Sequence, residues 1–348
     1  MSTAVRRLAK DGVAVVKTGL AREATESWRQ RSLGVLDHFR TLAVAKQLER
    51  TGEAGLGLGK EHGYRELVQK DRGRYDMNMD HHLVVDTGGG GGEPSAIPAS
   101  RSAAAECRST TAEGRSTAAE GTPTRRTSGL KNSFPEEERS TGGGGLASTT
   151  DLSDAGASLM ASIRSVLEPA IAPVLERSLG GEYVMNGQGL VISEPGTEAQ
   201  GWHADVSPIY GAQELWELNI PTGVLLPAYF FTVFMPLYDS THPGIGPTEL
   251  ALGSHLLTGE LKRKTVAEQY PAGDVVDRIV GASPGGVATM GSPGCECNAG
   301  DIFIMDGRLL HRGLANLSEQ ARPLVYMSFC RPWYHEWPRS QNEGRSLF

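Results

Sequence analysis

The apolar residues of the N-terminal part recur at helical spacing, interrupted by one strand-like run. Residues 5–10 predict a short helix, residues 12–16 predict a strand because they are rich in valine, and residues 21–50 predict a long helix. In the long helix, Val35 and Phe39 lie four positions apart and so fall on the same face. We therefore expect this helix to bury one side against a core.

Three further segments are expected to be helical or to end a helix. Residues 64–68 predict a short helix, and residues 73–76 predict the turn at its end, with entry into a substrate pocket as the alternative. A helical pattern returns over 152–179. Pro169 and Pro173 predict that it breaks into two pieces, because proline lacks the N–H that a helix interior uses.

The C-terminal half changes to short runs rich in β-branched and aromatic residues. These runs lie at 189–193, 229–237, 301–305 and 322–329 and are bounded by Gly, Pro or Asn. Short strands at uneven spacing, with few helical patterns between them, favour packed antiparallel sheets over a parallel α/β sheet. The pattern predicts a mainly β fold with flanking helices.

Residues 87–150 differ in composition from the rest of the chain. They are rich in Gly, Ser, Thr, Ala and Pro, and they contain an imperfect seven-residue repeat over 108–114 and 115–121. We expect a disordered insertion, and a regulated or partner-binding loop is the alternative. The predicted organisation is an N-terminal segment over 1–86, this insertion, a catalytic core over 151–340 and a tail over 341–348.

Composition and charge narrow the class of partner. The chain has 348 residues, 39% of them hydrophobic, which is enough for a sizeable core. The formal net charge of -7, with basic residues scattered among acidic ones, argues against nucleic acid. We expect the partner to be a small-molecule substrate and leave protein partners open.

The lack of a secretory signal and the low number of cysteines both favour an intracellular protein. The N-terminus lacks the apolar core of a secretory signal, and the sequence shows no uninterrupted apolar run of membrane-spanning length. Only four cysteines occur, too few for a disulfide scaffold, and Cys295 with Cys297 is interpreted as an ordinary loop, with a soft-metal pair as the alternative. We expect a soluble intracellular protein without a membrane segment, in the cytoplasm by default and with the peroxisome left open.

One short motif carries the chemistry of a metal site. His203 and Asp205 lie two positions apart and point the same way on an extended chain, and His311 supplies a second imidazole. Two histidines and one carboxylate hold Fe(II) on one face and leave the opposite positions open. A His-x-Asp alone is a weak signal, with a polar turn as its alternative, so the rest of the pattern decides.

Arg322 follows His311 by eleven residues and is expected to point into the protein. The polar residues 316–320 predict a turn that joins both residues in one hairpin. A buried guanidinium needs a carboxylate, and the distal carboxylate of 2-oxoglutarate fits because guanidinium binds it through two parallel hydrogen bonds. The alternative is a fixed salt bridge to Asp301 or Asp306.

These residues together resemble the phytanoyl-CoA dioxygenase family of iron and 2-oxoglutarate oxygenases, over residues 183–338. The family's metal ligands, its 2-oxoglutarate arginine and its Gly-Ser-His loop fall on His203, Asp205, His311, Arg322 and residues 253–255. The resemblance implies a double-stranded β-helix, a cupin-like jelly-roll barrel, with Fe(II) as metal and 2-oxoglutarate and O2 as co-substrates. Leu252 replaces the usual proline before the loop, and the insertion is foreign to the family pattern.

The resemblance also implies a reaction and a set of pocket residues. It implies a dioxygenase that hydroxylates a small organic or acyl substrate and releases succinate and CO2. Asp205 favours hydroxylation, because related halogenases have Gly or Ala there. The expected co-substrate pocket adds the following residues to Arg322: Gln200, Trp202, Thr232 and Tyr326.

Two other classes of protein carry a similar metal set. A non-catalytic cupin-like barrel binds metal without the reaction, but it has no need of Arg322. A zinc hydrolase needs a nearby Glu or second base, and none stands beside the His-x-Asp motif.

Overall fold

The structure is a computed structural model that describes residues 3–53, 58–59, 63–64, 66–79, 149–206, 227–256, 277 and 279–334. The chain divides into two compact units, Met1–Pro98 with Ser148–Phe348, and Ala99–Ala147. The second unit, most of the insertion expected over 87–150 and the expected tail lie outside the described residues. The predicted domain organisation therefore stays a prediction.

The first three elements agree with the sequence pattern. Helix α1 (Thr3–Asp11), strand β1 (Val13–Val16) and helix α2 (Arg22–Thr51) follow one another along the chain. Val35 and Phe39 are buried on the same side of α2, as predicted. The long helix therefore presents one apolar face to the core.

The helix predicted at 64–68 and the helix-end turn predicted at 73–76 are wrong. This stretch forms a hairpin of β2 (Leu67–Asp71) and β3 (Arg74–Asn78). Every residue of β3 pairs with the neighbouring strand β4 (Val184–Ser193). The hydrogen bonds to this distant strand override a weak local helical preference.

The predicted break in the second long helix is also wrong. Helix α3 (Thr149–Leu179) runs through Pro169 and Pro173 without interruption. Its apolar residues form a continuous buried stripe: Leu159, Ile163, Leu167, Ile171 and Leu175. Burial of this stripe offsets the backbone hydrogen bonds that the two prolines cannot donate.

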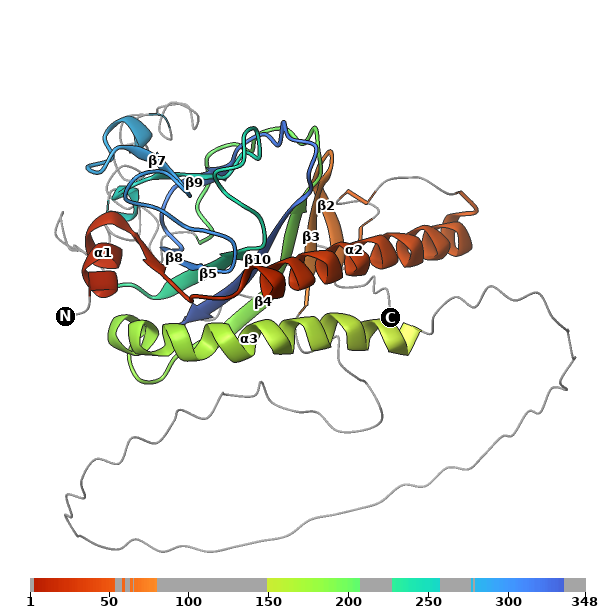
Figure 1. The fold of residues 1–348 in the computed structure, drawn as a ribbon, viewed down its shortest axis with the longest axis horizontal. Helices are drawn as coiled ribbons and strands as arrows, with labels where there is room; N and C mark the ends of the chain where they lie inside the picture. The colour runs from red at the N-terminus through yellow and green to blue at the C-terminus, as the bar shows by residue number, and fades with distance from the viewer. Residues whose placement is uncertain are drawn as a thin grey trace, which may run out of the picture. The chain divides into compact units, whose positions relative to one another are not determined.

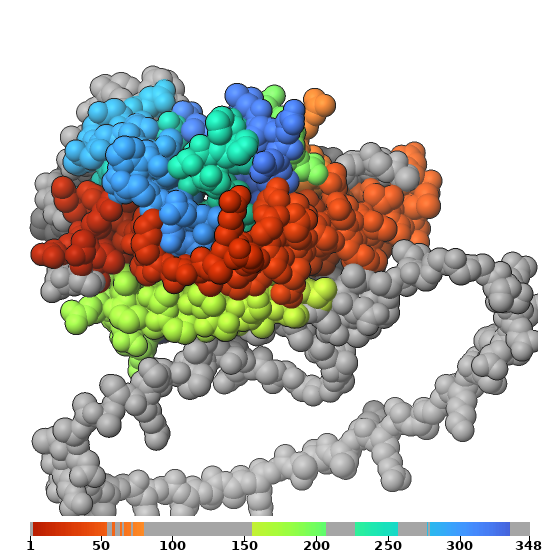
Figure 2. All heavy atoms as spheres, in the orientation of Figure 1, coloured from red at the N-terminus to blue at the C-terminus, as the bar shows by residue number. Residues whose placement is uncertain are grey.

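By length and composition alone, one segment of α3, Ala155–Leu179, could cross a membrane. Its apolar residues pack into one cluster with those of α2 and the sheet. Figure 1 shows α2 and α3 side by side along the larger sheet. In the space-filling view of Figure 2, their side chains form adjacent bands across this face.

The strands form two antiparallel sheets, with orders β1-β8-β5-β10-β4-β3-β2 and β7-β6-β9. The remaining elements are β5 (Phe230–Pro236), β6 (Thr248–Ala251), the 3-10 helix η2 (Ser254–Leu256), β7 (Val287–Thr289), β8 (Ile302–Asp306), β9 (His311–Gly313) and β10 (Arg322–Cys330). The four predicted strands and the mainly β class with flanking helices are confirmed. The architecture is a jelly-roll double sheet, and pairing among the described strands does not close it into a barrel.

The hairpin predicted between the His311 and Arg322 segments is wrong. Strand β9 belongs to the smaller sheet, whereas β10 lies between β4 and β5 in the larger one. The connection is fixed by Asn316, whose side-chain amide donates to the carbonyls of Ser193 at 3.0 Å and Gln320 at 2.8 Å. The chain therefore crosses from one sheet to the other between the two residues.

Alternation along β10 separates the helix-covered face from the space between the sheets. Val325, Met327 and Phe329 pack with the helices, whereas Leu324 and Tyr326 contact the apolar cluster shared with the smaller sheet. Residues two apart on a strand share a face, so Arg322 points to the side of Leu324 and Tyr326. Arg322 therefore points into the protein, as predicted, and its side chain is on the face of the larger sheet that is turned toward the smaller sheet.

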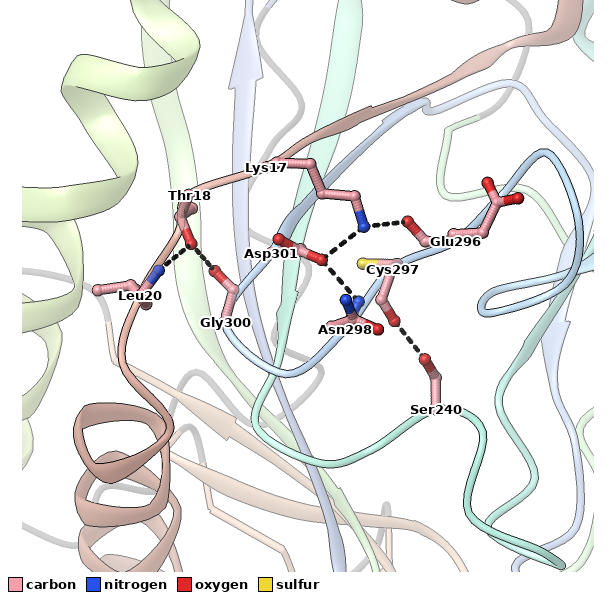
Figure 3. Close-up of polar contacts among 9 residues, drawn as sticks. All are labelled: Lys17, Thr18, Leu20, Ser240, Glu296, Cys297, Asn298, Gly300 and Asp301. Carbon is pink, nitrogen blue, oxygen red and sulfur yellow. Dashed lines mark hydrogen bonds and ion pairs between the residues drawn. The ribbon is translucent and has the colours of Figure 1, made fainter.

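A polar clasp ties the chain after β1 to the turn before β8 (Figure 3). Lys17 Nζ donates to Asp301 Oδ2 at 2.9 Å and to the Glu296 carbonyl at 2.7 Å. The Asn298 N–H donates to the same Asp301 oxygen at 2.7 Å. The clasp holds the β1 segment where it continues the larger sheet.

Candidate metal centre

His203 and His311 lie directly opposite each other in a two-residue antiparallel bridge. The His203 N–H donates to the His311 carbonyl at 3.0 Å, and the His311 N–H donates to the His203 carbonyl at 2.8 Å. The ring centroids are 4.3 Å apart. Two backbone hydrogen bonds thus hold both imidazoles on the same side of the bridge.

Asp205 completes a cluster of three donor atoms. One ligand atom from each of His203, Asp205 and His311 lies within 4.8 Å of the others. His311 Nε2 is 3.6 Å from Asp205 Oδ1. Because metal bonds to such donors are about 2.0–2.2 Å long, this spacing suits a single first-row ion.

The hydrogen bonds of the two rings leave the correct nitrogen for a metal. Nδ1 of His203 donates to the Gly201 carbonyl at 2.9 Å, and Nδ1 of His311 donates to the Leu309 carbonyl at 3.1 Å. A carbonyl only accepts, so each Nδ1 carries a proton, and in the neutral ring the lone pair is then on Nε2. Burial lowers the pKa of His311, with Asp205 opposing the shift, and this favours the neutral ring that a metal needs.

Thr232, on β5, fixes the carboxylate of the cluster. Its hydroxyl donates to Asp205 Oδ2. The other oxygen, Oδ1, is the one that faces His311. The donor set of two neutral imidazoles and one oriented carboxylate fits Fe(II).

Arg322 is buried, with 5% of its surface exposed, and its partners among the described residues are all neutral. Nη1 donates to the carbonyls of Ile245 at 3.3 Å and Leu314 at 3.2 Å. Nη2 donates to Ser193 Oγ at 3.0 Å. No carboxylate of the described chain forms an ion pair with this guanidinium.

Both salt bridges considered as alternatives for Arg322 are made by other residues. Asp301 pairs with Lys17 at 2.9 Å, and Asp306 pairs with Arg308 at 2.7 Å. A buried guanidinium without a carboxylate is costly, which is a reason to expect an anion from solution.

Gly313 leaves room at the point where the polar groups converge. A Cβ atom there would lie 2.9 Å from Gln200 Oε1, 3.0 Å from Arg322 Nη2 and 3.6 Å from Arg74 Nη2. Gln200 Oε1 accepts from the Gly313 N–H at 2.9 Å. Gly313 lies two residues beyond His311 in β9, so the polar groups around Gly313 lie next to the metal cluster.

Trp202 and Tyr326, expected in the co-substrate pocket, make contacts of other kinds. The Trp202 ring stacks against the Arg312 guanidinium, 4.7 Å from its carbon to the ring centroid. Neighbouring residues of an extended chain point to opposite sides, so Trp202 faces away from the His203 ring. The Tyr326 hydroxyl donates to Asp76 Oδ1 at 3.2 Å. Their predicted roles toward the co-substrate stay predictions.

The sequence did not single out Arg74, Ser193 or Gly313 as site residues. Ser193 ends a strand that was predicted, and its inward face could have been inferred from alternation along β4. Arg74 was assigned to the helix-end turn predicted for residues 73–76. The alternative for these residues was that they reach the substrate pocket. Gly313 offers no side chain, so its role emerges only from its neighbours.

The cysteine pair belongs to a loop and is separate from the metal cluster. Cys295 and Cys297 are each 1% exposed, and both are free thiols. Burial raises the pKa of Cys297 to about 12 and also raises the pKa of Cys295. Buried, protonated thiols are poor ligands, which favours the ordinary-loop interpretation.

The family model of Phytanoyl-CoA dioxygenase (PhyH) matches residues 102–324, more than half of the chain. The chain belongs to the phytanoyl-CoA dioxygenase family. Membership implies Fe(II) as the metal, with 2-oxoglutarate and O2, and the His-Asp-His cluster of this phytanoyl-CoA dioxygenase family member fits iron. The match begins earlier and ends earlier than the 183–338 expected from the motifs.

Two solved structures are similar to this phytanoyl-CoA dioxygenase family member over nearly its whole length. The non-heme alpha ketoglutarate dependent carbocyclase SnoK from nogalamycin biosynthesis is 15% identical with a TM-score of 0.46, and the alignment covers 95% of this chain and 84% of SnoK. AviO1 from Streptomyces viridochromogenes Tue57 is 15% identical with a TM-score of 0.41, covering 94% of each chain. Neither likeness is close enough to bear on the reaction of this chain.

Proposed function

We propose that this protein is an Fe(II)- and 2-oxoglutarate-dependent dioxygenase that hydroxylates a small organic or acyl substrate and releases succinate and CO2. His203, Asp205 and His311 would hold the iron, and Arg322 would bind the distal carboxylate of 2-oxoglutarate. Iron held there would supply the oxidising chemistry with 2-oxoglutarate and O2. The protein supplies binding and orientation.

The observation that carries the proposal is the relationship of Arg322 to the metal cluster. Its guanidinium is buried without a described carboxylate, and its Nη2 lies beside Gly313, two residues beyond His311. A barrel that only stores or senses metal has no use for such a group, because an unpaired buried cation destabilises the fold. A dicarboxylate anchored at Arg322 would extend its other end toward the cluster.

The remaining residues of the site restrain the ligands. The Gly201 and Leu309 carbonyls fix the ring orientations of the two histidines. The Thr232 hydroxyl holds Asp205 Oδ2 and so orients the carboxylate. A carboxylate at position 205 occupies the place that chloride takes in related halogenases, which supports hydroxylation as the outcome.

Anaerobic reconstitution with Fe(II), followed by 2-oxoglutarate and O2, tests the proposal through the yield of succinate. We expect the wild type to form succinate and His203→Ala and Arg322→Ala to lose about 100-fold or more. His242→Ala is the matched control, because His242 contacts the Pro243 carbonyl at 3.0 Å and takes no part in the cluster. Equal yields from wild type, His203→Ala and Arg322→Ala would refute the assignment.

A further inference from the structure

A cavity of about 200 Å³ lies between the long helices α2 and α3. Five residues of α2 and one of α3 form its walls: Arg31, Gly34, Val35, His38, Phe39 and Ala155. Both helices cover the face of the larger sheet that carries Val325 and Met327, whereas Arg322 is on the opposite face (Figure 1). The cavity is therefore separate from the metal cluster.

Gly34 leaves the middle of this cavity open. A Cβ atom at Gly34 would meet no atom of α3 within 4 Å. Glycine is unfavourable in a helix interior, because it loses more conformational freedom on folding than alanine. Helix α2 thus keeps an unfavourable residue at the point where a side chain would fill the cavity.

Arg31 supplies a positive charge at one end of the cavity. Its Nη2 donates to Ser158 Oγ of α3 at 3.2 Å. Among the described residues, no carboxylate forms an ion pair with this guanidinium. Because a guanidinium binds a carboxylate through two parallel hydrogen bonds, Arg31 is suited to hold an acidic group that enters the cavity.

His38 supplies an unsatisfied polar atom at the other end. Its Nε2 is buried and has no hydrogen-bond partner within the described chain. Burial lowers the pKa of His38, which favours the neutral ring. A buried nitrogen without a partner is costly, and a hydroxyl group satisfies it in either tautomer, since a hydroxyl both donates and accepts.

The spacing of the two polar ends sets the length of the molecule that fits. Arg31 and His38 are seven positions apart, so they lie on the same side of α2 and about 10.5 Å apart along its axis. Between them the cavity is lined by Val35, Phe39 and Ala155. An apolar cavity of about 150 Å³ already accommodates benzene, so a benzene ring with a polar group at each end fits this space.

We propose that this cavity is a second ligand site and that it binds a small aromatic acid with a hydroxyl group opposite the carboxylate. The carboxylate would pair with Arg31, the ring would lie against Val35 and Phe39, and the hydroxyl would reach His38. The inference goes beyond the proposed function, because the site lies across the larger sheet from the iron ligands.

Isothermal titration calorimetry of the full chain with 4-hydroxybenzoate tests the proposal. The wild type is expected to bind one molecule saturably. Gly34→Leu should abolish binding, because leucine fills the cavity and is also a better helix former than glycine. Arg31→Gln should weaken binding about tenfold or more, as for a lost charged hydrogen bond.

Two simpler probes assign the polar ends of the cavity. Phenol lacks the carboxylate, so Arg31→Gln should leave its binding unchanged. Benzoate lacks the hydroxyl, so His38→Phe should leave its binding unchanged while weakening that of 4-hydroxybenzoate. If Arg31→Gln weakens phenol as much as 4-hydroxybenzoate, Arg31 does not recognise the carboxylate and the proposed class of ligand is wrong.

Arg29→Gln is the matched control on the same helix. Arg29 pairs with Glu26 at 3.2 Å and does not line the cavity, so this variant should bind the acid as the wild type does. Thermal unfolding midpoints of all variants are recorded. Arg31→Gln alters a partly exposed side chain and carries the test if Gly34→Leu does not fold.

Arg322→Gln separates this site from the metal cluster. The variant should bind 4-hydroxybenzoate as the wild type does. Binding that is lost in Arg322→Gln but kept in Gly34→Leu would place the acid at the metal cluster and overturn the inference. The absence of binding to the wild type would also overturn it, and the proposed function would be unaffected.

Discussion

The hydroxyl of Thr232 donates to Asp205 Oδ2, which leaves Asp205 Oδ1 directed at His311. Thr232→Val keeps the shape of the side chain and removes this donor. We expect Fe(II) affinity to fall about 10- to 100-fold, as is typical when a partner of a metal ligand is lost. Anaerobic titration with Fe(II) measures the change. Thr232→Ser retains the hydroxyl and should bind as the wild type, and an unaltered affinity in Thr232→Val would contradict the assigned role.

Gly313→Ala should separate co-substrate binding from metal binding. The added methyl group would lie 2.9 Å from Gln200 Oε1 and 3.0 Å from Arg322 Nη2, where the carboxylate is expected. We expect 2-oxoglutarate affinity to fall about tenfold or more while Fe(II) affinity changes little. Titrations of both ligands on the same preparation check this. Loss of both affinities together would indicate a general disturbance of β9 instead.

Asp301→Asn should weaken the clasp shown in Figure 3. The carboxylate accepts from Lys17 Nζ and from the Asn298 N–H through the same oxygen. Hydrogen bonds to a buried charge contribute about 1.5–3 kcal/mol each, so we expect the free energy of unfolding to fall by about 1–3 kcal/mol in urea denaturation. Lys17→Met should cost less than about 1 kcal/mol, because Lys17 is 54% exposed and its charge is screened. A larger loss in Lys17→Met than in Asp301→Asn would contradict this account.

Stability is expected to decline at alkaline pH, in part because of Cys297. Burial raises the pKa of Cys297 to about 12, whereas an unfolded chain ionises the thiol near pH 8.5–9. Between these values the folded state holds a proton that the unfolded state has released, so rising pH favours unfolding. Cys297→Ser should lose about 1.5 kcal/mol less than the wild type between pH 8 and pH 10. Urea denaturation at both pH values measures the difference, and identical losses would argue against the shift.

The parts of the fold with strong local patterns were predictable from the sequence. Strands β5 and β8 are apolar runs bounded by turn residues, and α2 buries one face, with Val35, Leu36 and Phe39 at its centre. The His-x-Asp motif fixes the relative direction of two ligands, and the spacing to His311 and Arg322 gives the rest of the set. Such features can be predicted from residues that are close in the sequence or from a short motif.

The features that the sequence did not predict depend on contacts between distant residues. Hairpin β2–β3 is held by pairing with β4 more than a hundred residues later, so its local pattern is weak. For the same reason, residues 73–76, which include Arg74, were predicted to form a turn. Pro169 and Pro173 are tolerated because a buried stripe holds α3 together, which local rules for proline do not include. The crossing between β9 and β10 likewise depends on distant partners, because β9 pairs with β6 and β10 pairs with β4 and β5.

The pairing of β1 with β8 has a consequence for how the protein is made. Val13 lies opposite Met305 in the larger sheet, at nearly opposite ends of the described chain. During synthesis, β1 leaves the ribosome with its apolar face formed but without the strand that covers its edge. The backbone edge of β1 therefore stays unpaired until almost the entire described chain has been translated.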